Sequence, residues 1–244
     1  MVQLPNPDEV RATLDPVWFN TYWIKNALEL YEGVSKHADE LKENYNHFFG
    51  VIQKFSLDAA VLHISKIFDK SNPRYQKDTI PSLFSYLKAN LTDAYVVRLK
   101  VETLIGLGIS QCDADRLLPG LRTDFRKYKD EFIDIIENIV PDNKNNDTLK
   151  FLLSYRNKIL THQERLDDAL KEQLKYLPSL HEMEQLNNWA INFCLLAISL
   201  LTPNISLIPN GQSVRIAALN VVAKLLDKEL DNDYAARKLF YARI

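Results

Sequence analysis

The stretch TLKFLLSYRNKILTHQERLDDALKEQLKYL, residues 148–177, is the most informative segment of this chain. On an ideal helix, which advances ~100° per residue, its apolar side chains fall into one stripe. The members of this stripe are Leu152, Tyr155, Ile159, Leu166 and Leu170. Pro178 follows directly and stops the pattern. The stretch therefore predicts a long helix with one buried face.

Helical spacing recurs on both sides of this stretch, and no segment shows convincing strand alternation. Helices are predicted at 17–31, about 35–70, 80–91, 92–107, 121–139, 180–201, 213–230 and 234–243, with a short one that Asp113 caps. Pro5, Pro7 and Pro16 predict an irregular start, and Ser35 a helix N-cap. Tyr95 and three valines leave a strand as the alternative within 92–107.

The predicted fold is all-α, with an antiparallel helix bundle and extra helices at both ends. Residues 1–34 form an N-terminal extension helix, 35–202 the bundle, and 203–244 the C-terminal accessory helices. Only six glycines occur in 244 residues, which disfavours a turn-rich β architecture.

Charge and hydropathy narrow the expected partners. The net charge of −2 argues against nucleic-acid binding by bulk charge, so any such contact must be a local patch. The first sixteen residues lack the apolar core of a signal peptide. The most apolar run, 189–201, is too short to span a bilayer. We expect a cytoplasmic protein with no membrane partner.

Three polar side chains of the 148–177 stretch suit phosphodiester chemistry. Arg156 is a permanent cation, Asn157 a polar positioner, and His162 a group that exchanges a proton near neutral pH. On an ideal helix Arg156 and His162 lie about 120° apart and roughly 9 Å along the axis. Either the arginine reaches around the helix, or each site combines residues from two copies related by a twofold axis.

The surroundings of these residues are locally basic. Lys158 lies on the same side as His162, and a nearby cation favours the neutral imidazole that a general base needs. The five histidines form no metal-ligand pair, so we expect neither a metal nor another cofactor. Most helical arginines are solvated or salt-bridged, and most lone histidines at a stripe edge pack or hydrogen-bond.

Arg156-Asn157 followed by His162 resembles the Arg-polar-x(3–5)-His motif of HEPN domains. The segment Tyr155–Lys158 resembles the abortive-infection U-type branch, as do Ile64–Asp69 and Ile80–Leu83 upstream. The resemblance implies a four-helix core that dimerises around the motif. It also implies RNA cleavage without a metal, in toxin–antitoxin or phage-defence settings, with an antitoxin protein as a further partner.

By this resemblance, His162 transfers protons at the ribose 2′-hydroxyl or the leaving oxygen. Arg156 neutralises the developing phosphorane charge, and Asn157 orients the phosphate or holds the motif across the dimer. The residues expected to bind substrate are Lys158, Arg165 and Tyr155. Asp69 is expected to orient a motif side chain, although a surface acid at a helix end is an equal alternative.

A non-catalytic module remains the alternative function. Such a HEPN-like dimer binds RNA, nucleotide or a partner protein without turnover. It is supported by Thr161, where a small apolar residue often precedes the histidine, and by Glu164, where aspartate is expected. A structural helical subunit without a ligand is a third reading.

Overall fold

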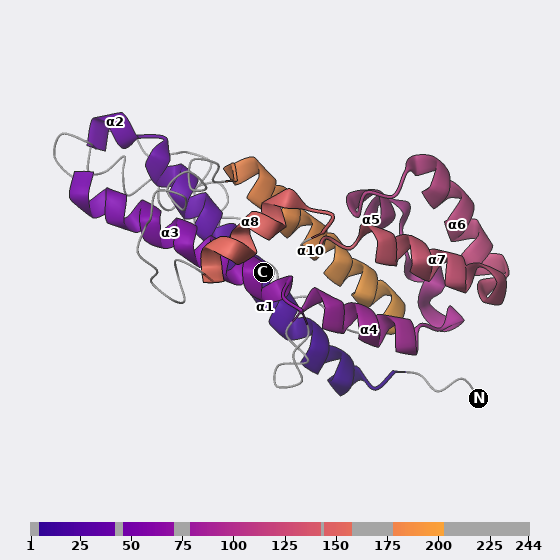
Figure 1. Ribbon diagram of the computed structural model, residues 1–244. Coiled ribbons are helices and arrows are strands. Elements are labelled where there is room, and N and C mark those ends of the chain that lie inside the picture. Colours follow the sequence, from indigo (N-terminus) through magenta and orange to yellow (C-terminus); the bar gives the residue numbers. More distant parts are fainter. Residues whose placement is uncertain (1–4, 42–45, 71–78, 143, 158–177, 203–244) are drawn as a thin grey trace, which may run out of the picture. The chain divides into compact units, whose positions relative to one another are not determined.

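The computed structural model describes residues 5–41, 46–70, 79–142, 144–157 and 178–202, and the elements within them are helices (Figure 1). In chain order they are α1 Pro7–Ser35, α2 Ala38–Leu41, α3 Asn46–Ile67, α4 Ile80–Asn90, the 3₁₀-helix η1 Asp93–Arg98, α5 Val101–Gly106, α6 Gln111–Thr123, α7 Phe125–Ile139, α8 Asp147–Tyr155 and α10 Leu180–Leu201. The prediction of an all-α fold is confirmed. Across these described ranges, no helix has the length and apolar character needed to cross a membrane.

The chain divides into two compact units. The described residues of the first unit are 5–21, 64–70, 79–142, 144–157 and 178–202, and those of the second are 22–41 and 46–63. Helices α1 and α3 therefore contribute residues to both units. The predicted division at residues 34 and 202 stays a prediction, and its third segment, 203–244, lies outside the described residues.

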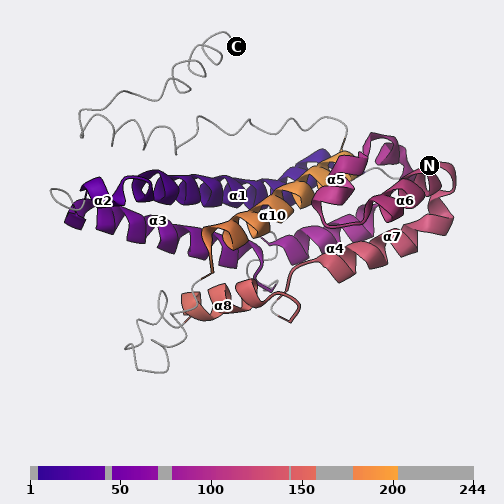
Figure 2. The ribbon, with the colours of Figure 1, turned by 90° about the horizontal axis from the view of Figure 1, so that it is seen from above.

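Helix α10 forms the centre of the first unit. It packs against α4, η1 and α5, while α6 packs on α5, α7 and η1 (Figures 1 and 2). Phe193 of α10 is fully buried between Trp189, at 5.2 Å between ring centroids, and Phe84 of α4, at 6.3 Å. The Trp189 indole N–H donates to the Leu107 carbonyl at 3.0 Å, which ties α10 to the end of α5. Burial of these aromatic side chains supplies much of the driving force for this packing.

The N-terminal caps fix where α10 and α4 begin. Ser179 and Glu182 form a capping box, and α10 then runs to Leu201 as its apolar pattern predicts. Thr79 caps α4, and Pro81 occupies the first turn, where its missing N–H costs nothing.

The prediction of one helix over 92–107 is wrong. The 3₁₀-helix η1 ends at Arg98, and α5 begins at Val101. The Arg122 side chain of α6 donates to the carbonyls of Val97 and Leu99, at 3.3 and 2.8 Å. These carbonyls accept from a side chain of another helix, and the buried Leu99 anchors the extended link. The break is therefore stabilised by tertiary contacts that spacing along the chain cannot reveal.

Two predictions near the start of the chain also differ from the structure. Pro16 lies inside α1, because Val10, Leu14 and Val17 around it are fully buried and outweigh one lost backbone hydrogen bond. Ser35 does not cap a following helix: it is the last residue of α1, and its hydroxyl donates to the Tyr31 carbonyl.

The predicted boundaries around α6 and α7 also shift. Ser110 caps α6 in place of Asp113, since its hydroxyl accepts the Asp113 N–H at 3.1 Å. The helix predicted over 121–139 begins at Phe125, because Asp124 ends α6 and caps α7.

The 148–177 stretch is described only at its start. Helix α8 is capped by Asn146 and ends at Tyr155. Residues 158–177 and the predicted helices at 213–230 and 234–243 lie outside the described residues.

Candidate functional site

Helix α8 leads directly into the motif residues and is fixed at three points. The Asn146 side chain accepts the Leu149 N–H at 2.8 Å, which caps the first turn. Leu149 and Leu152 are fully buried. The Ser65 hydroxyl of α3 donates to the Leu152 carbonyl at 3.3 Å. These contacts hold the end of α8 against the last turn of α3, where Asp69 follows.

One edge of the Arg156 guanidinium is anchored to the end of α3. Its Nη1 donates to Asp69 Oδ2 at 2.7 Å and to the Ser65 carbonyl at 3.4 Å. The Arg156 side chain is 19% exposed and that of Asp69 46% exposed. This is a charge-assisted hydrogen bond at the border of the core, which fixes the arginine while leaving it within reach of solvent.

The other edge of the same guanidinium meets its neighbour along the chain. Nε and Nη2 of Arg156 donate to Asn157 Oδ1, at 3.0 and 2.8 Å. Adjacent residues of an α-helix do not face each other. Residues 156–157, however, form a π-helical turn. Such turns are rare and concentrate at functional sites.

This π-helical turn corrects one premise of the sequence analysis. The angle of about 120° between Arg156 and His162 assumed an unbroken α-helix through residues 156–157. Within residues 144–157, the α-helical segment ends at Tyr155. The ideal angle therefore does not apply across this turn.

Arg156 and Asn157 line an open pocket of about 620 Å³. The end of α3, the start of α4, the loop after α7 and α8 supply its walls. Their lining residues are Phe68, Asp69, Lys70, Pro81, Val140, Pro141, Asp142, Lys144, Leu153, Arg156 and Asn157. The volume falls within the range of small-molecule sites, and the lining combines apolar and charged side chains.

Three cationic residues and two carboxylates line this pocket. Asp142 accepts the backbone N–H groups of Lys144 and Asn145, at 2.7 and 2.9 Å. These bonds, that of Lys144 first, hold the pKa of Asp142 below its usual range. Asp142 is thus a turn-forming carboxylate, and Lys70 and Lys144 add positive charge beside Arg156. Sequence spacing gave no signal for these two lysines, because only the folded chain brings 70 and 144 together.

The predicted site residues separate into three groups. The structure brings together Asp69, Arg156 and Asn157. Tyr155 is half-buried and stacks on Phe151 at 6.2 Å between ring centroids, and it does not line the pocket. His162, Lys158 and Arg165 lie outside the described residues.

Within the described ranges, no group of three or more His, Cys, Asp or Glu side chains is placed to hold a metal ion.

Comparison with known proteins identifies one family. The HEPN family model described as AbiU2 matches residues 8–207, which is most of the chain and includes the pocket just described. No curated protein and no solved structure gives a significant match. The chain therefore belongs to the AbiU2 family of HEPN proteins.

Proposed function

We propose that the protein is a metal-independent endoribonuclease of HEPN type, acting as a toxin or phage-defence effector. The observation that supports this most is the Arg156 guanidinium, held at the wall of an open, basic pocket by Asp69 and Asn157. Membership of the AbiU2 family supports a HEPN-type domain.

The two edges of Arg156 suit different tasks. The Nη1 edge contacts a carboxylate and a backbone carbonyl, both fixed by α3. The Nε/Nη2 edge contacts the neutral amide oxygen of the exposed Asn157. A phosphate binds this fork with two parallel, charge-assisted bonds, which are about twice as strong as neutral ones. We therefore assign the Nε/Nη2 edge to the scissile phosphate, with Asn157 moving to a second phosphate oxygen.

The proposed reaction is an internal transesterification. The ribose 2′-oxygen attacks the adjacent phosphorus, and the bond from phosphorus to the 5′-oxygen breaks. His162 accepts the 2′-hydroxyl proton or donates one to the leaving oxygen, and water serves the other transfer. Arg156, preorganised by Asp69, stabilises the negative charge of the phosphorane. The products are a 2′,3′-cyclic phosphate and a 5′-hydroxyl, and the scheme balances without a metal or redox cofactor.

The proposal includes the partners implied by the family. RNA is the substrate, with Lys158, Arg165 and Tyr155 as substrate contacts, to which the pocket adds Lys70 and Lys144. A homodimer around the motif combines His162 and Arg156 from two copies, and an antitoxin protein is the expected inhibitor.

The test is cleavage of single-stranded RNA in EDTA by purified protein. We expect turnover by the wild type and loss in His162→Ala and Arg156→Gln. Two matched controls should cleave normally. His181→Ala removes an exposed histidine that contacts Gln185, and Arg116→Gln removes an arginine paired with Glu131. Equal activity of His162→Ala and wild type would refute the assignment.

A non-catalytic RNA-, nucleotide- or protein-binding dimer is the second candidate. The satisfied contacts of Arg156 favour it, since a paired arginine also serves to join α8 to α3. It predicts binding without turnover, with Arg156→Gln weakening binding more than His162→Ala. Multiple-turnover cleavage that is lost in His162→Ala would eliminate it.

A further inference from the structure

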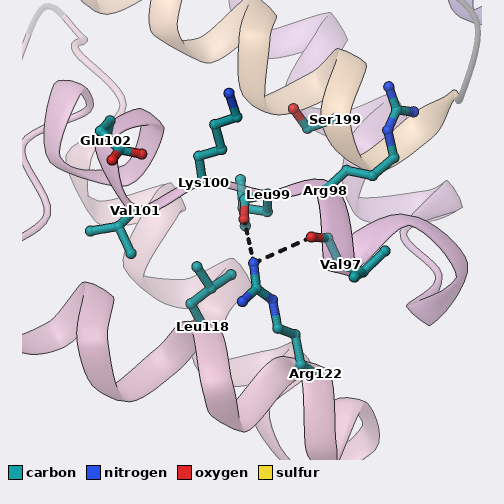
Figure 3. A pocket seen from close by; sticks show the side chains of 9 residues that line it. All are labelled: Val97, Arg98, Leu99, Lys100, Val101, Glu102, Leu118, Arg122 and Ser199. Atoms are coloured by element: carbon teal, nitrogen blue, oxygen red, sulfur yellow. Dashed lines mark hydrogen bonds between the residues drawn. The ribbon is translucent and has the colours of Figure 1, made fainter.

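Three cationic side chains line a second hollow of the first unit, away from the Arg156 pocket. It has a volume of about 560 Å³ and shares no lining residue with the Arg156 pocket. The link between η1 and α5 runs through it, with α6 and α10 on either side (Figure 3). Its lining residues are Val97, Arg98, Leu99, Lys100, Val101, Glu102, Leu118, Arg122 and Ser199.

Arg122 is held in place before any ligand arrives. Its Nη2 atom donates to the carbonyls of Leu99 and Val97, at 2.8 and 3.3 Å (Figure 3). Both acceptors are neutral, so the guanidinium keeps its full charge at the hollow. A fixed arginine loses little side-chain entropy when it binds an anion.

Arg98 and Lys100 extend the positive charge along the hollow. Arg98 donates to the Thr202 carbonyl, again a neutral group. Within the described ranges, none of these three cations forms an ion pair with a carboxylate. Glu102 is the one acidic residue in the lining, so three cations against one carboxylate leave a net charge of +2.

The arrangement of the charges favours an extended ligand. In Figure 3, Lys100 and Arg98 extend toward the Ser199 side of the link, and Arg122 approaches the link from α6. The cations therefore do not converge on one point, as a site for a single small anion requires. Val97 is 70% exposed and offers an apolar surface for a ribose or base. A positively charged groove that follows the sugar–phosphate backbone is one feature of single-stranded nucleic-acid sites.

We propose that this hollow binds the sugar–phosphate backbone of single-stranded RNA at a distance from the cleavage pocket. The inference rests on the proposed function, because it makes RNA the ligand of both sites. It supplies the local positive patch that a chain of net charge −2 needs in order to bind RNA.

The test is RNA binding by Lys100→Gln, with Lys88→Gln as the matched control. Lys100 is exposed, so its loss leaves the fold intact, while Lys88 is an exposed lysine paired with Glu137 at 2.9 Å. Fluorescence anisotropy with a labelled single-stranded RNA measures the dissociation constant between about 0.05 and 0.3 M salt. The logarithm of the binding constant falls linearly with the logarithm of the salt concentration, and one lost phosphate contact reduces this salt slope by about 0.7. At about 0.1 M salt this corresponds to about a fivefold loss of affinity.

The expected result is this loss in Lys100→Gln and none in Lys88→Gln. Equal affinities and equal salt slopes for the two variants overturn the second site. If the two variants bind RNA equally and the wild type still cleaves RNA, this inference is rejected and the proposed nuclease activity stands. Binding that depends on Lys100 without any cleavage supports the hollow and rejects the nuclease. A wild type that binds no RNA rejects both.

Discussion

Breaking the ion pair between Asp69 and Arg156 tests how the candidate site is held together. Asp69→Asn keeps the size of the side chain and removes its charge, while Arg156→Gln removes the opposite charge. The 2.7 Å contact joins a largely buried arginine to a half-exposed carboxylate. An exposed pair contributes about 0.2–1 kcal/mol and a hydrogen bond to a charged group about 1.5–3 kcal/mol. We therefore expect a coupling of about 1 kcal/mol.

The assay is a double-mutant cycle of urea unfolding, followed by far-UV circular dichroism near neutral pH. Each single variant should lose about 1 kcal/mol of unfolding free energy, which lowers the melting temperature by about 2–4 °C. The double variant should lose clearly less than the sum, because the first change has already broken the contact between Asp69 and Arg156. In about 1 M salt the coupling should shrink, since the pair is partly exposed. Additive losses, within about 0.3 kcal/mol, would refute a direct pair at this site.

Four further predictions concern the fold. Phe193→Ala should cost about 3–5 kcal/mol in urea unfolding, because the ring is fully buried between α4 and α10, and a cost below about 1 kcal/mol would contradict that packing. Ser179→Ala should cost about 1 kcal/mol through the lost cap of α10, and an unchanged stability would count against the capping box. The Ser179 N–H and hydroxyl hold the pKa of Glu182 below its usual range. The stability advantage of wild type over Glu182→Gln in urea unfolding should therefore be full near neutral pH and fade on acidification, whereas an advantage that grows in acid would contradict these bonds. Gly108→Ala should lower the free energy of unfolding by about 1 kcal/mol, because the φ of Gly108 is +94°. Gly50→Ala should raise it by a similar amount, because Gly50 lies on an open face of α3. Melting temperatures that shift in the same direction in both variants would contradict this contrast.

Helical spacing was sufficient to predict α4 and α10. The helices predicted at 80–91 and 180–201 lie at Ile80–Asn90 and Leu180–Leu201, and the structure adds the caps Thr79 and Ser179. The break at Leu99 was not predictable in this way. It depends on Arg122, which lies more than twenty residues along the chain and donates to carbonyls exposed by the break. Helical spacing reports burial within one segment and carries no information on such distant hydrogen bonds.

The candidate site was predictable only in part, for a similar reason. The types and order of Arg156 and Asn157 indicated phosphate chemistry, and the family resemblance suggested Asp69. The π-helical turn that brings the two motif side chains together has no signature in the spacing. Lys70 and Lys144 join the pocket through the packing of α8 on α3, which follows from long-range contacts.

Analysis of the RNA ends after incubation with EDTA tests whether Arg156 takes part in metal-independent cleavage. We expect 2′,3′-cyclic phosphate and 5′-hydroxyl ends from the wild type over many turnovers, and none from Arg156→Gln. Intact RNA with the wild type, or the same ends at the same rate from Arg156→Gln, would contradict it.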